Sequence, residues 1–295
     1  MKTTAKSVSK LNEINLNFYK TAGKYWNESL LYFWQGFLRV GKYFENQDKI
    51  LDIGCGNGRF YFFLLHHFSH LDLDYLGIDK FWILEDELKE NFVDTITKIN
   101  LQELPKIKLN LENIELSGKI NPDLGWKNIP KSPKNYYFNQ TGKKNQNQHL
   151  IKFLDLDITK LENFQKLQKY TKICLFGVIH HIPSFDLRAK IFENIYNSLE
   201  KNGILIFTTW QFLEIPRLQK HVLTAEEVKN LDFAGDLESG DYLLTWTKKV
   251  ESLRYSHFFD DAEIGKLLKN KFEILETFHS DGAEKRNKYY ICRRV

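Results

Sequence analysis

Apolar residues follow two different patterns along the chain. Between residues 8 and 48 they recur at near-helical spacing, which predicts helices. From residue 49 onward, short apolar runs alternate with helix-like stretches. Five runs are long enough for buried strands, at 50–54, 75–79, 151–157, 172–178 and 203–210, and helical patterns lie at 59–68 and 187–199. Such alternation is typical of βαβ units that build a parallel sheet.

Two later apolar runs, 272–279 and 288–295, are joined by a polar turn and predict a terminal antiparallel hairpin. We therefore expect an α/β fold with a mostly parallel seven-stranded sheet and helices on both faces. Residues 1–48 should form an N-terminal helical cap, and residues 49–295 the main domain. Within that domain, residues 211–271 are expected to cover the mouth of a substrate site.

One stretch interrupts the alternation. Residues 106–148 are rich in Asn, Lys and Gln, and they hold eight lysines against three acidic residues, a net charge of +5. A loop of this length inside a compact domain is functional or poorly ordered. Two interpretations stay open, a solvated insertion and a basic arm that faces RNA.

Composition narrows the class of protein. Of the 295 residues, 42% are apolar and 15% aromatic, which suffices for a packed core and excludes a disordered chain. The formal net charge of +4 is too small for a general nucleic-acid coat. The three cysteines are far apart, so neither a disulfide framework nor a structural metal site is expected. Because no signal peptide or membrane-length apolar stretch is evident, we expect a cytoplasmic protein without a membrane partner.

The strongest motif is the glycine-rich string LDIGCGNGRF, residues 51–60, at a strand end that opens a helix. Its glycines at 54, 56 and 58 allow a tight turn and a close approach of a ligand to the backbone. The spacing is GxGxG with Asp52 two residues ahead, which differs from the GxGxxG of dinucleotide enzymes.

Further acidic residues follow at later strand ends. Asp79 ends the next strand, 27 residues after Asp52, where a carboxylate can take both ribose hydroxyls of a nucleoside. Asp157 ends the third strand and can accept from an adenine amino group, with Asp155 as the competing choice. Phe176 and Gly177 end the fourth strand.

This order of motifs resembles that of class I S-adenosylmethionine (SAM) methyltransferases, which implies a Rossmann-like sheet and SAM as cofactor. Asp52 would meet the ammonium group of the cofactor, and Phe176-Gly177 would lie near its sulfonium. The cofactor-binding residues that the resemblance implies are Asp52, Gly54, Cys55, Gly56, Gly58, Asp79, Lys80, Asp157, Ile158, Phe176 and Gly177.

Other strings are more specific. They are His180-His181-Ile182-Pro183, FTTWQF (207–212), GDYLLTW (240–246), RYSH (254–257), SDGAEKRNKYY (280–290) and the N-terminal Phe18-x-x-Thr21 with Trp26. They resemble the tRNA methyltransferases that esterify a 5-carboxymethyl group on the wobble uridine. The resemblance implies tRNA as substrate and a small activating subunit as a further partner. The chain departs from that pattern at Ala22, where the family has Arg, and at Tyr170–Lys172, where the family has an acidic residue.

The chemical group that accepts the methyl decides whether the protein needs a general base. A carboxylate is ionised at pH 7 and needs no general base, so Arg254 could hold it while Tyr255, His257 and Trp210 frame a base. An amine or hydroxyl acceptor would need a base, for which His180, His181 and His257 are the candidates. The candidate catalytic residues are therefore His180, His181, Arg254, Tyr255 and His257, and the predicted substrate contacts are Trp26, Trp210, Asp241, Tyr242 and Asn287.

Most of these side chains also have a purely structural interpretation. His181, Trp210 and Trp246 are suited to core packing, and Arg254 to a salt bridge with an acid such as Asp241. Two other functions therefore remain open. One is a small-molecule O- or N-methyltransferase, and the other is a catalytically silent relative that binds RNA or a protein partner.

Overall fold

The computed structural model describes residues 3–28, 33–56, 58–68, 70–80, 137–138, 150–231, 237–247 and 249–295. The predicted insertion at 106–148 lies outside these residues except for positions 137–138, so its order and its role in RNA binding stay predictions. Within the described residues, no helix has the length and apolarity needed to cross a membrane.

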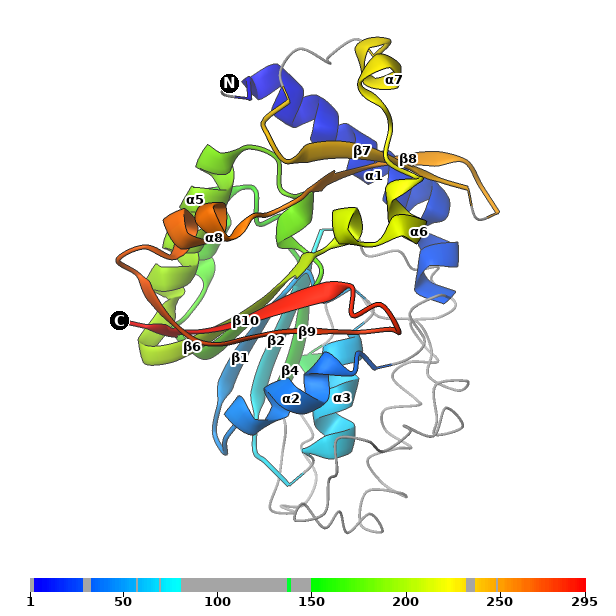
Figure 1. Ribbon diagram of the computed structural model, residues 1–295. Coiled ribbons are helices and arrows are strands. Elements are labelled where there is room, and N and C mark those ends of the chain that lie inside the picture. The colour runs from blue at the N-terminus through cyan, green and yellow to red at the C-terminus, as the bar shows by residue number, and fades with distance from the viewer. Residues whose placement is uncertain are drawn as a thin grey trace.

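The described strands form one large sheet in the order β3-β4-β2-β1-β5-β6-β10-β9 (Figure 1). In chain order these strands are β1 (Lys49–Ile53), β2 (Asp74–Asp79), β3 (Tyr137–Phe138), β4 (Leu150–Asp155), β5 (Tyr170–Leu175), β6 (Leu199–Trp210), β9 (Phe272–Ser280) and β10 (Asn287–Arg294). From β4 to β6 all neighbours are parallel, whereas β10 runs antiparallel to both β6 and β9. The predicted fold class and terminal hairpin are confirmed. The short β3, antiparallel to β4, adds an eighth strand to the seven expected.

Helices cover both faces of this sheet (Figure 1). Among the described residues, the helices that pack on this sheet include α3 (Arg59–His67), α5 (Phe185–Ser198) and α8 (Asp261–Leu268), with the 3-10 turns η5 (Leu161–Lys166) and η6 (Ile179–His181) nearby. Successive strand residues point to opposite faces, so Ile50 joins a core with α3 while Leu51 joins another core with α5 and α8. Both faces are therefore buried, as the near-continuous apolar runs predicted.

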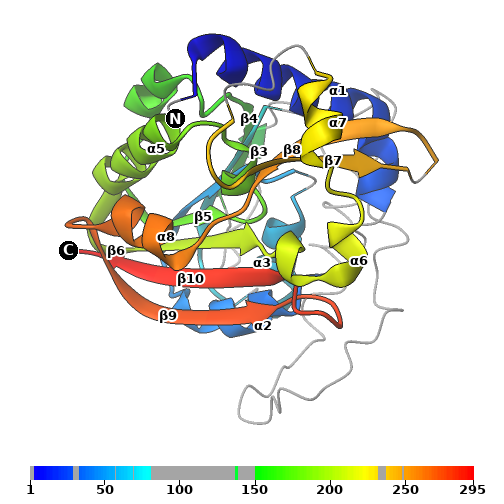
Figure 2. The same cartoon turned by 45° about the horizontal axis from the view of Figure 1, so that its top comes forward.

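The N-terminal region is two separate helical pieces. A long helix, α1 (Ala5–Glu28), lies across the end of the molecule, and the short α2 (Gly36–Val40) with η1 (Gly41–Tyr43) packs beside α3 (Figures 1 and 2). The aromatic rings of Phe37 and Phe60 lie 4.9 Å apart across that contact.

The segment 211–271 carries its own two-stranded sheet, β7 (Asp241–Trp246) and β8 (Ser252–His257), together with η7 (Phe212–Glu214), α6 (Pro216–Gln219) and α7 (Ala225–Lys229). α1 lies against this sheet (Figures 1 and 2). Leu11, Leu243 and Tyr255 form a small buried core between them. The segment thereby holds α1 in place over the carboxyl ends of the parallel strands.

Candidate active site

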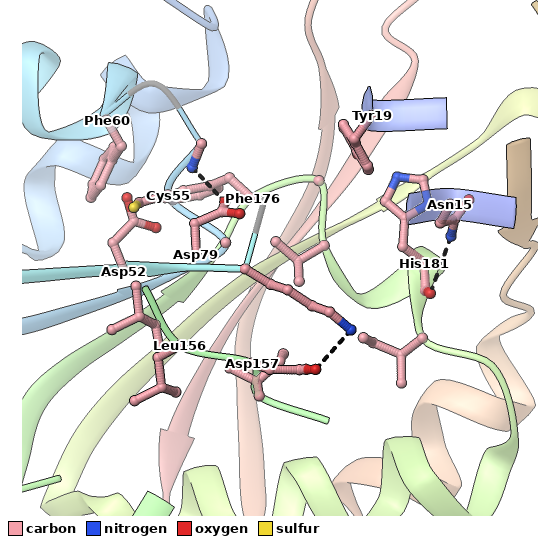
Figure 3. A pocket seen from close by; sticks show the side chains of 18 of the residues that line it. Asn15, Tyr19, Asp52, Cys55, Phe60, Asp79, Leu156, Asp157, Phe176 and His181 are labelled. Atoms are coloured by element: carbon pink, nitrogen blue, oxygen red, sulfur yellow. Dashed lines mark hydrogen bonds and ion pairs between the residues drawn. The ribbon is translucent and has the colours of Figure 1, made fainter. Parts of the chain in front are cut away.

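A pocket opens at the carboxyl ends of β1, β2, β4 and β5 (Figure 3). The strand order reverses between β1 and β5, and open α/β sheets bind their ligands outside the strand ends at such a point. Side chains of α1, together with Trp34 and Phe37, form the opposite wall. The pocket therefore lies between the main sheet and the N-terminal helices.

The glycine-rich loop forms one side of the pocket with a left-handed backbone, since Gly54, Gly56 and Gly58 all have positive φ (68°, 53° and 73°). A Cβ on Gly54 would lie 2.3 Å from Cγ2 of Val178, so no larger residue fits there. A Cβ on Gly56 would have no neighbour within 4 Å, so the backbone of Gly56 faces open space. Gly54 and Cys55 donate their N–H groups to the carbonyl of Ile78, which ties the loop to β2.

Asp79, the last residue of β2, lies directly beside this loop. Its Oδ2 accepts a hydrogen bond from the N–H of Gly56 at 2.8 Å (Figure 3). Asp52 lies deeper, 1% exposed, and accepts from the hydroxyl of Tyr75 at 2.5 Å. Burial raises the pKa of Asp52 to about 7, although the Tyr75 hydrogen bond opposes the change.

Asp157 follows β4 and faces the pocket from the other side. Its Oδ1 accepts from the backbone N–H and the hydroxyl of Thr159, and its Oδ2 lies 2.7 Å from Nζ of Lys80 (Figure 3). Burial raises the pKa of Asp157, but the hydrogen bonds from Lys80 and Thr159 outweigh it and the pKa lies below its ordinary value. Of the two predicted alternatives, Asp157 lines the pocket, whereas the side chain of Asp155 lies outside the described part of the chain.

Four further predicted cofactor residues line this pocket, whereas Gly58 is not among the described residues that do so. The four are Cys55, Ile158, Phe176 and Gly177. Gly177 has a φ of 77°, and a Cβ there would lie 3.3 Å from the Trp34 ring, so the backbone passes close to the N-terminal wall. Burial raises the pKa of the Cys55 thiol well above its ordinary value, which keeps it uncharged.

His181 lines the end of the pocket nearest α1 (Figure 3). Its Nδ1 lies 3.1 Å from the Tyr255 carbonyl and its Nε2 lies 2.6 Å from Nη2 of Arg254. A carbonyl only accepts and a guanidinium only donates, so Nδ1 carries the proton and Nε2 accepts. Burial and the Arg254 charge hold the pKa of His181 well below its ordinary value. The imidazole is neutral and both of its nitrogens are engaged.

Arg254 lies behind this wall, buried between two aromatic rings. Its guanidinium carbon is 4.8 Å from the Trp210 ring and 5.3 Å from the Phe18 ring. It also hydrogen bonds to the hydroxyl of Tyr19, which lines the pocket. Arg254 thus acts on the pocket through Tyr19 and His181. Burial raises the pKa of Tyr19, so its phenol stays protonated.

His180 is buried beside His181, with ring centroids 4.4 Å apart, and is not among the described residues that line the pocket. Its Nδ1 has no hydrogen-bond partner within the described structure. Burial holds its pKa well below the ordinary value, so His180 is neutral.

His257, Tyr255 and Asp241 meet in a buried network away from the pocket lining. His257 contacts Asp241 through Nδ1 and Glu263 through Nε2, both at 2.7 Å, and the Tyr255 hydroxyl donates to Asp241 at 2.7 Å. Burial lowers the pKa of His257, but the two carboxylates outweigh it and the pKa is raised. With both nitrogens donating, His257 has no lone pair to accept a proton, so this geometry opposes its predicted role as a base.

The predicted substrate contacts also have structural partners. Trp210 stacks on Arg254, Tyr242 packs against Phe212, and the Asn287 amide donates to Asp281. None of them lines the pocket among the described residues. Trp26 lies in α1, and its side chain is outside the described part of the chain.

Several residues that line the pocket were not predicted from the sequence, namely Asn12, Asn15, Tyr19, Trp34 and Arg59. The first three have a detectable signal, because positions 12, 15 and 19 share one face of a helix. Arg59 belongs to the glycine-rich motif but was not assigned a role. Within the described structure, no cluster of three or more His, Cys, Asp or Glu side chains could hold a metal ion.

A family model for a methyltransferase domain matches residues 25–275. Among solved structures, a SAM-dependent methyltransferase from Methanosarcina mazei is similar in fold, with 16% identity, a TM-score of 0.51, and coverage of 87% of this chain and 96% of that one. Magnesium protoporphyrin IX methyltransferase from Synechocystis has 12% identity, a TM-score of 0.46, and coverage of 91% of this chain and 81% of its own. No curated protein matches the chain in sequence.

Proposed function

The chain belongs to the methyltransferase domain family, and from this premise we propose that it transfers the methyl group of SAM to the carboxylate of a modified wobble uridine in tRNA. The observation that carries the cofactor assignment is the convergence of the glycine-rich loop with Asp52, Asp79 and Asp157 in one pocket. Three consecutive parallel strands deliver these carboxylates to one edge of the sheet.

Each part of this pocket suits one part of SAM. Asp79 is placed to take the ribose hydroxyls, and Asp157, with Ile158 beside it, to take the adenine. Asp52 suits the ammonium group. Gly56 offers backbone that no side chain shields. When bound, SAM supplies an electrophilic methyl carbon on a sulfonium. The protein's contribution is to orient the acceptor behind that carbon and to exclude water.

The acceptor end favours a group that needs no general base. His181 has both nitrogens engaged, and the phenol of Tyr19 stays protonated. A carboxylate is ionised at pH 7, and it can attack the methyl carbon without losing a proton. The Tyr19 hydroxyl, in contact with the Arg254 cation, suits an anionic acceptor. These contacts support a carboxylate, and the resemblance to the wobble-uridine enzymes supports its place in tRNA.

A small-molecule carboxylate is the second candidate acceptor. The RYSH string and the Ser280–Asn287 turn carry much of the tRNA resemblance, yet their described side chains hold the fold together. His257 pairs with Asp241 and Glu263, and Asn287 pairs with Asp281. Because these residues do not line the pocket, a small acid remains compatible with it.

Transfer of isotopically labelled methyl groups separates these candidates. The protein is incubated with labelled SAM and either total RNA or a metabolite extract, and labelled nucleosides are identified by mass spectrometry. Part of each product is treated with mild alkali, which releases methanol from esters but not from N-methyl groups. We expect alkali-labile label in a tRNA nucleoside. Label confined to metabolites would contradict the tRNA acceptor, and alkali-stable label would contradict the carboxylate.

A further inference from the structure

The turn between β9 and β10 is built around one buried carboxylate, Asp281, which is 2% exposed. Its Oδ2 accepts from the Asn287 amide and the Tyr289 hydroxyl, each at 2.7 Å, and its Oδ1 accepts from the backbone N–H of Gly36 at 2.9 Å. A Cβ on Gly36 would lie 2.3 Å from the Tyr289 ring, so the chain passes tightly over β10 here. The turn thereby fixes the position of residues 34–36.

Trp34, two residues before this anchor, lines the pocket. Its indole Nε1 is buried and has no hydrogen-bond partner within the described residues. An indole nitrogen can only donate, and a buried donor left without an acceptor loses the hydrogen bond that it makes to water in the unfolded chain. The N–H of Trp34 therefore calls for an acceptor from a ligand.

Arg59 lines the pocket beside Trp34. It is the first residue of α3, directly after the glycine-rich loop, and its guanidinium carbon lies 4.5 Å from the Trp34 ring. Burial lowers the pKa of Arg59 to about 10, and the charge of Asp281 opposes that change. Arg59 is therefore still a cation at neutral pH, and it presents several donors in a planar fork that suits a carboxylate.

The same pocket also holds Asp52, whose carboxyl is close enough to act on the charge of Arg59. Arg59 and the Trp34 N–H can donate to an anion, and Asp52 can pair with a cation. Together these groups match the carboxylate and the ammonium group of an α-amino acid. We propose that Arg59 and the indole N–H of Trp34 hold the carboxylate of the methionine part of SAM, and that Asp281 positions them both. This inference rests on the proposed function. The Ser280–Asn287 turn thus serves cofactor selection.

The test compares two ligands that differ at the proposed contact. S-adenosylhomocysteine has the amino acid group, whereas 5′-methylthioadenosine has the same adenosine and thioether without it. Calorimetry measures the Kd of both for the wild type, Arg59→Met, Asp281→Asn and Arg217→Met. Arg217 is the matched control, because it pairs with Glu284 of the same turn from an exposed position outside the pocket lining.

We expect Arg59→Met to raise the Kd for S-adenosylhomocysteine by about 10- to 100-fold, since hydrogen bonds to charged groups contribute about 1.5–3 kcal/mol. Its affinity for methylthioadenosine should stay within about twofold of the wild type, because that ligand lacks the contact. Asp281→Asn should give a smaller loss, again for S-adenosylhomocysteine alone. Arg217→Met should leave the Kd of both ligands unchanged.

Equal losses for both ligands, or no loss in Arg59→Met, would overturn the inference while the proposed function stands. A wild type that binds neither ligand would overturn both. If Arg59→Met does not fold, Trp34→Phe keeps an aromatic ring and removes the indole N–H. Trp34→Phe should raise the Kd for S-adenosylhomocysteine by about 3- to 10-fold and leave the Kd for methylthioadenosine unchanged. Equal changes in Kd for the two ligands would contradict the contact.

Discussion

Asp52 lies at the end of β1, where its surroundings act on the carboxyl in opposite directions. Burial raises its pKa to about 7, while the hydrogen bond from Tyr75 favours the ionised form. Near neutral pH the free protein therefore contains both forms of this group. A ligand ammonium beside Asp52 would favour the ionised form, so cofactor binding and proton release are coupled.

This coupling predicts that S-adenosylhomocysteine binds more tightly as the pH rises from 6 to 8, by up to about tenfold, because Asp52 becomes ionised over that range. Calorimetry at pH 7 in two buffers of different ionisation enthalpy should show a net release of about half a proton per site, since Asp52 is about half protonated there. Asp52→Asn should bind more weakly and lose the proton release. A wild type with flat affinity and no proton release would contradict the role of Asp52.

Individual residues differ in how far the sequence could place them. The glycines and Asp79 were predictable because they belong to one short motif and the strand end that follows it. The buried pairing of His257 was not, since Asp241 lies 16 residues before it and Glu263 six residues after it, and only β7–β8 pairing and the start of α8 bring the three side chains together. Tyr19 and Trp34 were missed because the apolar pattern over residues 8–48 shows that Asn12, Asn15 and Tyr19 share a helix face but not that this face, or Trp34, meets a ligand.

The β7–β8 sheet is joined to the main domain by buried charges. His257 on β8 bridges Asp241 and Glu263, and Arg188 on α5 contacts both Glu263 and Glu238. Breaking a buried charge pair by removing one partner costs about 3–5 kcal/mol, because the other charge stays buried. These contacts hold the small sheet, and with it α1, against α5 and α8.

We therefore predict that His257→Gln lowers the free energy of unfolding by about 3–5 kcal/mol. The pKa of His257 is raised by folding. Its stabilisation is thus fully present below its unfolded pKa and is lost as the pH rises through the folded value. Thermal unfolding should show the largest Tm difference from wild type near pH 6 and a smaller one at pH 9. The exposed His279→Gln serves as control, and a difference independent of pH would contradict the charged pair.

Helices and strands were more predictable than their boundaries. Apolar runs located the strands of the parallel sheet and the terminal hairpin, because burial on both faces demands them. β6 begins at Leu199, four residues before the predicted run, because Leu199 pairs with Tyr170 before a shift in register. The short β3 was not predicted, since two residues leave no periodic pattern.

The net charge of the whole molecule is concentrated in the 106–148 insertion. The chain carries +4 in total and the 106–148 insertion carries +5, so the remaining residues carry −1. A phosphate backbone requires clustered cations, and the pocket itself offers mainly carboxylates around the cofactor site. The insertion therefore holds the net positive charge of the chain, whereas the proposed cofactor site rests on described residues alone.

The cofactor site is tested most directly by titration calorimetry of SAM into the wild type, Asp79→Ala and Asp74→Ala. Asp74 is the matched control, because it lies at the opposite end of β2 from the pocket. We predict one SAM site in the wild type, unchanged binding in Asp74→Ala, and an affinity about 10- to 100-fold weaker in Asp79→Ala, which loses its hydrogen bonds to the ribose. A wild type that does not bind SAM, or an Asp79→Ala variant that binds like the wild type, would contradict this account.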